Sequence, residues 1–304
     1  MSRPVRGLVP VLATPFHPDG SLDRASLRRL TEFQLRAGAD GVAVFGMASE
    51  GFALTAADRD AVLADVRDVV AGAVPVVAGV SPTSLATALE QCGQAVAGGA
   101  DALMVLPPYL AKPGPQQLVD FYGALGERAG APVMVQDAAA TTGVAMPVPL
   151  VTEFGKLGGV DSVKVESAPT VPKIAETVAA APDGFDVLGG QNAFFVLEEL
   201  AAGAVGTMPA CEFTDALRPV LDAWAAGRAA QAHGAYERLL PLIRFGMQAG
   251  FAWAVHKEVL VRRGVIGSAA VRMPAKALTE PLRAQLDGIL ERLALPPVAA
   301  GGAR

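Results

Sequence analysis

Two short stretches, GADGV at residues 38–42 and GADAL at residues 99–103, are nearly the same, and each joins a helix-like segment to an apolar run. Glycine is favoured just after the last turn of a helix, where the chain turns toward the next element. Looser copies of the phrase occur at residues 158–161 and 203–206. A unit of helix, turn and buried strand that repeats in this way predicts a parallel β-sheet covered by helices.

Eight apolar runs fit this repeat, and each is short enough for a buried strand. They are Leu8–Phe16, Gly41–Gly46, Pro75–Val80, Ala102–Pro108, Pro132–Asp137, Val160–Ser167, Asp186–Gly190 and Gly203–Pro209. Eight helix–strand units within about 210 residues predict a (β/α)8 TIM barrel. The alternative is a doubly wound open sheet, but no GxGxxG motif follows the first run, which weakens its dinucleotide-binding form.

The pattern changes after the eighth run, because residues 213–304 are mostly helix-like and contain no clear strand-like run. We therefore expect a barrel over residues 1–212 and a C-terminal helical extension over residues 213–304 that packs on the barrel. The extension contains the aromatic residues Phe251 and Trp253. We expect them in a core or a subunit interface rather than against a substrate.

The composition excludes several classes of function. Of the 304 residues, 52% are hydrophobic and 18% charged, and the net charge is −5. No basic run is present, which argues against nucleic acid as a partner. The longest apolar run, Val69–Val80, contains Gly72 and Pro75 and is too short to cross a bilayer, so no membrane partner is expected. The first apolar segment is interrupted by Pro10 and Pro15 and fits a first strand better than a signal peptide.

Cysteine and histidine usage points to neither disulfides nor a metal. Cys92 and Cys211 lie far apart and lack CxxC spacing, so a reducing, cytoplasmic location is the expectation. The three histidines show no ligand spacing with one another or with the cysteines: His17, His233 and His256. A structural metal site is therefore not expected.

The sixth run, VDSVKVES at residues 160–167, contains the residue on which a functional hypothesis depends. Lys164 stands at the centre of an apolar strand, where a lysine is unusual unless it has a partner or a function. Removal from water favours the neutral amine, which can attack a ketone and form a Schiff base. Glu166 lies two residues further and so projects from the same face of the strand. The plainer alternative is an edge-strand lysine paired with a surface glutamate.

A barrel carries its active site at the C-terminal ends of its strands. The residues that follow these ends form a polar, glycine-rich ring, and only Lys164 among the six lysines falls inside a predicted strand. This position favours the functional interpretation of Lys164, and Glu166 projects from the same strand face as a candidate partner. The candidate substrate-binding residues at the other strand ends are Thr14, Ala48, Ser49, Gln136 and Gly190.

On the basis of these residues, the chain resembles the dihydrodipicolinate synthase / N-acetylneuraminate lyase family of class I, Schiff-base aldolases. The similarity runs from Thr14-Pro15-Phe16 nearly to the C-terminus, and Lys164 falls where the family has its imine-forming lysine. The resemblance implies a (β/α)8 barrel with C-terminal helices that assembles as a homo-oligomer, a tetramer or dimer. It also implies a small 2-keto acid as substrate and no cofactor.

The departures from the family motifs concern the residues that move protons. The strand-2 motif, Gly-Thr/Ser-Thr-Gly-Glu in the family, is GMASE at residues 46–50 here, so its hydroxyl pair is missing and Ser49 is displaced by one place. The strand-5 Tyr-Asn of the family is Gln136-Asp137, so the proton-transferring tyrosine is absent. An arginine of the synthases aligns near Thr141 or Thr142, and the second tyrosine of the strand-4 motif aligns with Leu110.

A subgroup of the family is more similar. The motifs KVE at residues 164–166, QD at 136–137, EEL at 198–200, GAVGTM at 203–208 and KEVL at 257–260 resemble L-2-keto-3-deoxyarabonate dehydratases. The resemblance suggests that Lys164 forms an imine with a 2-keto-3-deoxy sugar acid and that Glu166 removes the C3 proton and helps expel the C4 hydroxyl as water.

Several roles and functions stay open at this point. Gln136 either holds a substrate hydroxyl or the hydrolytic water, or is a structural hydrogen-bonding residue. Ser49 and nearby backbone amides are expected to bind the substrate carboxylate, and Glu50 to brace loops. The alternative functions are a retro-aldolase that releases pyruvate from a 2-keto-3-deoxy or 4-hydroxy-2-keto acid, and a non-catalytic barrel that binds keto acids.

Overall fold

The computed structural model describes residues 4–298, and within this range eight parallel strands form one sheet in the order β1-β8-β7-β6-β5-β4-β3-β2. Seven of the eight predicted runs contain one of these strands, and the first, Leu8–Phe16, overlaps its strand only at Leu8. Their bounds are β1 Gly7–Leu8, β2 Val42–Val44, β3 Val76–Val80, β4 Ala102–Val105, β5 Val133–Asp137, β6 Val160–Val165, β7 Asp186–Gly189 and β8 Gly206–Thr207.

The sheet closes on itself through the chain just after β1. Val11 bridges Ala43 of β2 on one side and Ala210, beyond β8, on the other. The amide of Leu12 donates to the carbonyl of Ala43 at 2.8 Å, so the two edges of the sheet are joined. The fold is therefore the predicted (β/α)8 barrel, and the alternative of an open sheet is wrong. The first strand is shorter than the predicted run because Pro10 has no N–H to donate to the ladder.

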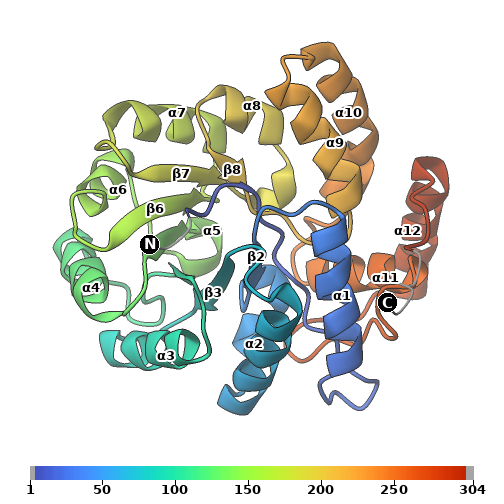
Figure 1. Cartoon of the computed structure of the whole chain (residues 1–304), viewed down its shortest axis with the longest axis horizontal. Coiled ribbons are helices and arrows are strands. Elements are labelled where there is room, and N and C mark those ends of the chain that lie inside the picture. The colour runs from blue at the N-terminus through green and yellow to red at the C-terminus, as the bar shows by residue number, and fades with distance from the viewer. Residues whose placement is uncertain (1–3, 299–304) are drawn as a thin grey trace.

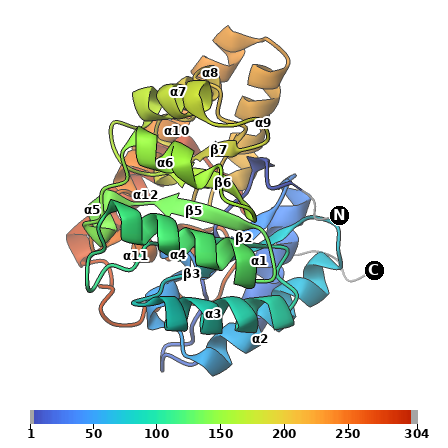
Figure 2. The same ribbon diagram turned by 90° about the vertical axis from the view of Figure 1, so that its left-hand side faces the viewer.

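The helices surround the strands, as Figure 1 shows. Those that follow strands β1 to β7 are α1 Arg24–Arg36, η1 Met47–Ser49, η2 Gly51–Ala53, α2 Ala56–Val70, α3 Leu85–Ala97, α4 Pro115–Arg128, α5 Ala139–Thr142, α6 Val148–Phe154, α7 Thr170–Ala180, η3 Gln191–Ala193 and α8 Val196–Ala201. In Figure 2 the helices α3 and α4 lie over β3 and β5, against which they pack.

Side chains alternate between two cores, as expected for strands buried on both faces. Residues such as Val77, Met104 and Leu188 belong to a cluster that fills the barrel interior. Their neighbours along the strands, such as Val105 and Val187, belong to a larger cluster between the strands and the helices. The alternation fixes which residues at the strand ends can face the interior.

After β8 the chain is helical, as predicted: α9 Thr214–Ala225, α10 Ala229–Phe245, α11 Ala252–Arg262 and α12 Glu280–Leu293. These helices share a separate apolar cluster and lie together on one side of the barrel (Figure 1). The indole N–H of Trp253 in α11 donates to the carbonyl of Met47 at 2.6 Å, so the extension reaches the loop after β2. The boundary between residues 212 and 213 stays a prediction. No helix among residues 4–298 is long and apolar enough to cross a membrane.

Candidate active site

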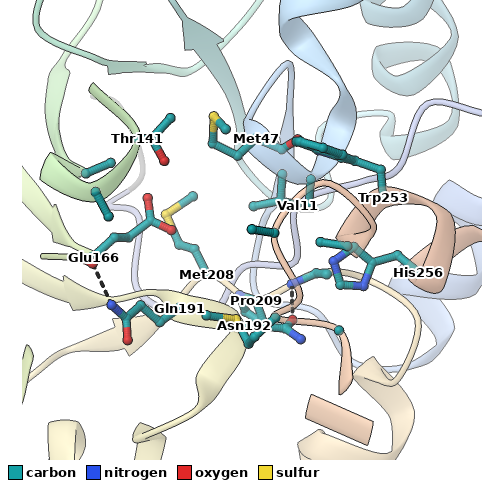
Figure 3. A pocket seen from close by; sticks show the side chains of 18 of the residues that line it. Val11, Met47, Thr141, Glu166, Gln191, Asn192, Met208, Pro209, Trp253 and His256 are labelled. Carbon is teal, nitrogen blue, oxygen red and sulfur yellow. Dashed lines mark hydrogen bonds between the residues drawn. The ribbon is translucent and has the colours of Figure 1, made fainter. Parts of the chain in front are cut away.

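A cavity of about 380 Å3 opens at the C-terminal ends of the strands. Its lining comes from strand ends and from the segment that leads into α11, and Figure 3 shows these side chains facing a common space. The lining includes Ala48, Lys164, Glu166, Gln191 and His256. The cavity therefore lies where a barrel carries its active site.

Lys164 occupies a central strand. β6 pairs with β5 on one side and β7 on the other, and Lys164 stands in register with Gln136 and Leu188. Leu188 belongs to the interior cluster, so Lys164 also faces the interior, and only 3% of the residue is exposed. The alternative of a lysine on an edge strand is therefore wrong.

The carboxylate of Glu166 is the partner of this amine. Lys164 Nζ lies 3.0 Å from Glu166 Oε1, as the shared strand face predicts. Gln136 Nε2 donates to Glu166 Oε2 at 2.7 Å, and Gln191 Nε2 donates to the backbone carbonyl of Glu166 at 2.7 Å. Gln136 does not line the cavity, so its observed contact is with the carboxylate. One oxygen of Glu166 is thereby held by Gln136, and the other contacts the amine.

Gly190 makes room for this pair. A Cβ atom at this position would lie 2.5 Å from Glu166 Cγ and 3.0 Å from Lys164 Cε. Neither distance is compatible with the present side-chain positions. Gly190 therefore acts on the site through the space that it leaves, which is a different role from a direct substrate contact.

The loop after β2 presents backbone and apolar side chains to the cavity. Met47 and Ala48 line it, whereas Ser49 does not. The Ser49 hydroxyl is buried and has no hydrogen-bond partner among the described residues. Thr14 also lies outside the lining, and its hydroxyl donates to the carbonyl of Ser49 at 2.6 Å. Thr14 and Ser49 thus contact each other outside the cavity lining. Trp253 contacts the same loop through the carbonyl of Met47.

Trp253 corrects one expectation from the sequence. Its ring lines the cavity and packs edge-on against Phe52, with centroids 5.0 Å apart. The expectation that Trp253 lies away from the substrate space is therefore wrong. The residue belongs to the extension, and periodicity in a helical segment does not reveal which face will close a pocket formed by another part of the chain.

A buried ion pair supports the same loop. Glu50 pairs with Lys257 of α11, and both side chains are fully buried. Lys257 Nζ also donates to the carbonyl of Ala270 at 2.7 Å, and the amide of Arg272 donates to Glu50 Oε2 at 2.9 Å. Burial lowers the pKa of Lys257 to about 8. Its amine is enclosed by these partners and does not reach the cavity.

A second carboxyl group lies behind β7. Glu199 Oε1 accepts a hydrogen bond from the Thr170 hydroxyl at 2.7 Å, and Oε2 has no hydrogen-bond partner among residues 4–298. Burial raises the pKa of Glu199 to about 7, and the nearby carboxylate of Glu166 adds to this shift. A Cβ on Gly189 would lie 2.0 Å from Glu199 Oε2, so Gly189 separates this carboxyl from the barrel interior.

The far wall of the cavity contains a pair that the sequence analysis did not identify. His256 Nδ1 lies 2.8 Å from Glu212 Oε1, and both residues are buried. Glu212 comes shortly after β8, and a polar residue just beyond a barrel strand could have been identified as a candidate site residue from the sequence. His256 comes from α11, and nothing in its spacing connects it with a strand end.

No other lysine and no tyrosine in the described chain reaches the cavity. Lys164 is the only one of the six lysines in its lining, and all six lie in the described part of the chain. None of the three tyrosines, Tyr109, Tyr122 and Tyr236, lines it either. Among residues 4–298, no group of three or more histidine, cysteine, aspartate or glutamate side chains is arranged to hold a metal ion.

A closed parallel barrel with an interior lysine facing this cavity defines a class, and comparison with known proteins agrees with it. The chain belongs to the Dihydrodipicolinate synthetase family, which it matches over residues 4–293, and is thus an enzyme of the Schiff-base lyase and aldolase type. It is 34% identical to L-2-keto-3-deoxyarabonate dehydratase of Azospirillum brasilense over 95% of this chain and 94% of the relative. It is 28% identical to 4-hydroxy-tetrahydrodipicolinate synthase of Syntrophus aciditrophicus, over 95% of this chain and 99% of the relative.

Solved structures give the same result. The crystal structure of dihydrodipicolinate synthase from Rhodopseudomonas palustris matches with a TM-score of 0.89 at 30% identity, over 95% of this chain and 97% of that one. The resemblance inferred from the motifs is therefore confirmed at the level of the family. The relatives are named as a dehydratase and as synthases, and the choice between these activities rests on the side chains of the site.

Proposed function

We propose that this protein is a dehydratase of a 2-keto-3-deoxy sugar acid, of the L-2-keto-3-deoxyarabonate dehydratase type. The observation that carries the proposal is the 3.0 Å contact between Lys164 Nζ and Glu166 Oε1 in a cavity that no tyrosine lines. An amine beside a carboxylate can form an imine and then move a proton at the adjacent carbon. The tyrosine that transfers protons in the aldolases of the family has no counterpart in the lining of this cavity.

The first step is imine formation. Neutral Lys164 attacks the C2 carbonyl of the keto acid, and one water leaves as the C=N bond forms. The iminium withdraws electrons from C3, so a C3–H bond becomes acidic. Glu166 Oε1 lies close enough to the imine nitrogen to reach a proton on the next carbon.

The second step is elimination. Glu166 takes the C3 proton, and the electron pair enters the C2–C3 bond to give an enamine. The enamine then expels the C4 hydroxyl, which leaves as water with the proton that Glu166 returns. Water then hydrolyses the imine at C2, which frees Lys164 and releases a 2-oxo acid with a C3–C4 double bond. The tautomer of this product is an oxo-acid semialdehyde. The net change is the loss of one water.

The contacts of the carboxylate favour this single-base scheme. Gln136 Nε2 donates to Glu166 Oε2, which leaves Oε1 for proton transfer. Since Ser49 does not line the cavity, we propose that the substrate carboxylate meets the backbone of Met47 and Ala48.

The test has two parts. Borohydride with pyruvate or a 2-keto-3-deoxy acid is expected to add covalent mass to the wild type and none to Lys164→Ala. The Glu166→Gln variant is expected to keep this adduct and to lose turnover by a factor of roughly 100 or more. Gln keeps the shape of the side chain, and Glu153→Gln on the exposed surface is the matched control.

Identification of the product separates the proposed reaction from its alternatives. Release of water with an intact carbon chain supports the dehydratase. Pyruvate as product would instead establish a retro-aldolase, and an imine without turnover of any keto acid would establish a binding protein. An adduct that survives Lys164→Ala would remove Lys164 from the mechanism.

The proposal also includes assembly and location. In line with the family resemblance, we expect a homo-oligomer, a tetramer or dimer, in the cytoplasm. Light scattering on the purified chain measures the first property directly.

A further inference from the structure

The wall of the cavity opposite Glu166 is formed by α11 and the chain that follows β8. Figure 3 shows Glu166 and His256 on opposite sides of the cavity. His256 lines this wall although only 4% of the residue is exposed. The cavity lining also includes the apolar residues Met208, Pro209 and Ala210 from the chain that follows β8.

The imidazole of His256 is held by a buried carboxyl group. His256 Nδ1 lies 2.8 Å from Glu212 Oε1, and Glu212 is fully buried. An ionised carboxylate only accepts hydrogen bonds, so Nδ1 then carries the proton. The other nitrogen, Nε2, makes no hydrogen bond to any residue that the structure describes. The pair thus fixes the ring and leaves one polar atom without a partner.

The surrounding residues leave space for this ring and do not compete for its free nitrogen. A Cβ at Gly246 would lie 3.0 Å from His256 Cε1 and 3.2 Å from Asn192 Nδ2. The amide of Asn192 is already engaged, since Oδ1 accepts from the Ala210 N–H at 3.0 Å and Nδ2 donates to the carbonyl of Ile243 at 3.4 Å. Nε2 makes no hydrogen bond of its own with these groups, and His256 lines the cavity, so water or a ligand in the cavity can bind Nε2.

The chemistry of the wall selects the kind of group that it binds. With C2 joined to Lys164, the part of a sugar acid beyond C3 extends away from the strand-6 lysine into the remaining cavity. A hydroxyl both donates and accepts, so it pairs with Nε2 in either protonation state of the ring. A second carboxylate only accepts hydrogen bonds, so it cannot pair with Nε2 while Nδ1 carries the single proton of the ring.

We propose that His256, positioned by Glu212, binds the hydroxyl group at the far end of the substrate chain and so selects hydroxylated over deoxygenated keto acids of the same length. This inference rests on the proposed function, and it names the residue that determines specificity at the distal end. Glu212 acts through His256 and is a positioning residue.

The experiment compares two substrates and two replacements. The substrates are 2-keto-3-deoxypentonate and its analogue without the C5 hydroxyl, 4-hydroxy-2-oxopentanoate. His256→Asn keeps an N–H near the Nδ1 position for Glu212 and has no group at the Nε2 position. His256→Gln places an amide near the Nε2 position. His233→Asn, on α10 and packed edge-on against the Trp224 ring, is the matched control.

The measured quantity is the ratio of kcat/KM for the two substrates. We expect the wild type and His233→Asn to prefer the hydroxylated acid by roughly 100-fold or more, because a site that hydrogen-bonds a hydroxyl rejects the analogue without it. His256→Asn is expected to bring this ratio within about tenfold of unity. The ratio for His256→Gln is expected to lie between those of the wild type and His256→Asn. Glu212→Gln is expected to raise KM for the hydroxylated acid more than it lowers kcat.

A wild-type ratio near one, or the same ratio in His256→Asn as in the wild type, overturns the inference. Failure of the proposed function gives a different result. If both acids are cleaved to pyruvate, the dehydratase is wrong and the ratio of cleavage rates still reports on His256. If neither turns over, the fraction of each acid trapped by borohydride at a fixed concentration gives the same preference. Trapping of pyruvate, which has no distal hydroxyl, reports whether each variant has folded.

Discussion

Replacement of Glu199 by glutamine is expected to change how the stability of the protein depends on pH. The carboxyl group is 1% exposed, and burial raises its pKa from 4.5 to about 7. The folded state therefore binds this proton more tightly than the unfolded state. The resulting stabilisation is fully present below pH 4.5 and is lost as the pH rises through about 7.

The magnitude follows from the two pKa values of Glu199. About two and a half pH units separate them, and each unit is worth about 1.4 kcal/mol, so the full effect is about 3 kcal/mol. Of this, about 2 kcal/mol is lost between pH 5.5 and pH 8.5. In Glu199→Gln the side chain no longer titrates, and its carbonyl oxygen can still accept the hydrogen bond from Thr170.

Urea denaturation at pH 5.5 and pH 8.5, at one protein concentration, measures this difference. The free energy of unfolding of Glu199→Gln minus that of the wild type is expected to increase by about 2 kcal/mol from pH 5.5 to pH 8.5, because only the wild type loses stability over this range. Glu153→Gln, at an exposed position, is the control and is expected to follow the wild type. Parallel pH dependence of the wild type and Glu199→Gln would refute the reasoning.

Two further predictions concern the support of the site. Gly190→Ala is expected to abolish imine trapping and to lower the free energy of unfolding by about 1–3 kcal/mol. The new Cβ would lie 2.5 Å from Glu166 Cγ and 3.0 Å from Lys164 Cε, so both side chains would have to move. Trapping at the wild-type level would contradict this prediction. Lys257→Met is expected to lower the free energy of unfolding by about 3–5 kcal/mol, because it leaves Glu50 buried without its cation. The double variant Lys257→Met with Glu50→Gln is expected to recover most of this loss. Thermal denaturation of the single and double variants checks the second prediction, and equal loss in both would contradict it.

The barrel was predictable because its signals are local. A glycine at a helix end and a short apolar run identify one unit, and eight such units leave few arrangements for a parallel sheet. The position of Lys164 and Glu166 on one face also follows from the two-residue period of a strand. The 3.0 Å contact between them agrees with that expectation.

The contacts between distant segments were not predictable in this way. Ser49 and Thr14 were expected to bind substrate because they follow strand ends, but the turn at 47–49 points Met47 and Ala48 into the cavity instead. Trp253 and His256 belong to a helix whose pattern records burial and not the identity of the space that it faces. Such contacts depend on the packing angle of α11, which no short stretch of sequence encodes.

The sequence alone determined the number of strands, their parallel arrangement and the strand position of the amine, because each depends on patterns within short segments. Closure of the sheet was decided by the contacts of Val11 and Leu12 with distant segments. The tertiary structure decided which groups surround that amine. Gln136 meets Glu166 across neighbouring strands, Gly190 leaves the space for both side chains, and His256 with Glu212 closes the far wall. These contacts join residues up to 44 positions apart, and only the closed barrel with its C-terminal helices brings them within contact distance.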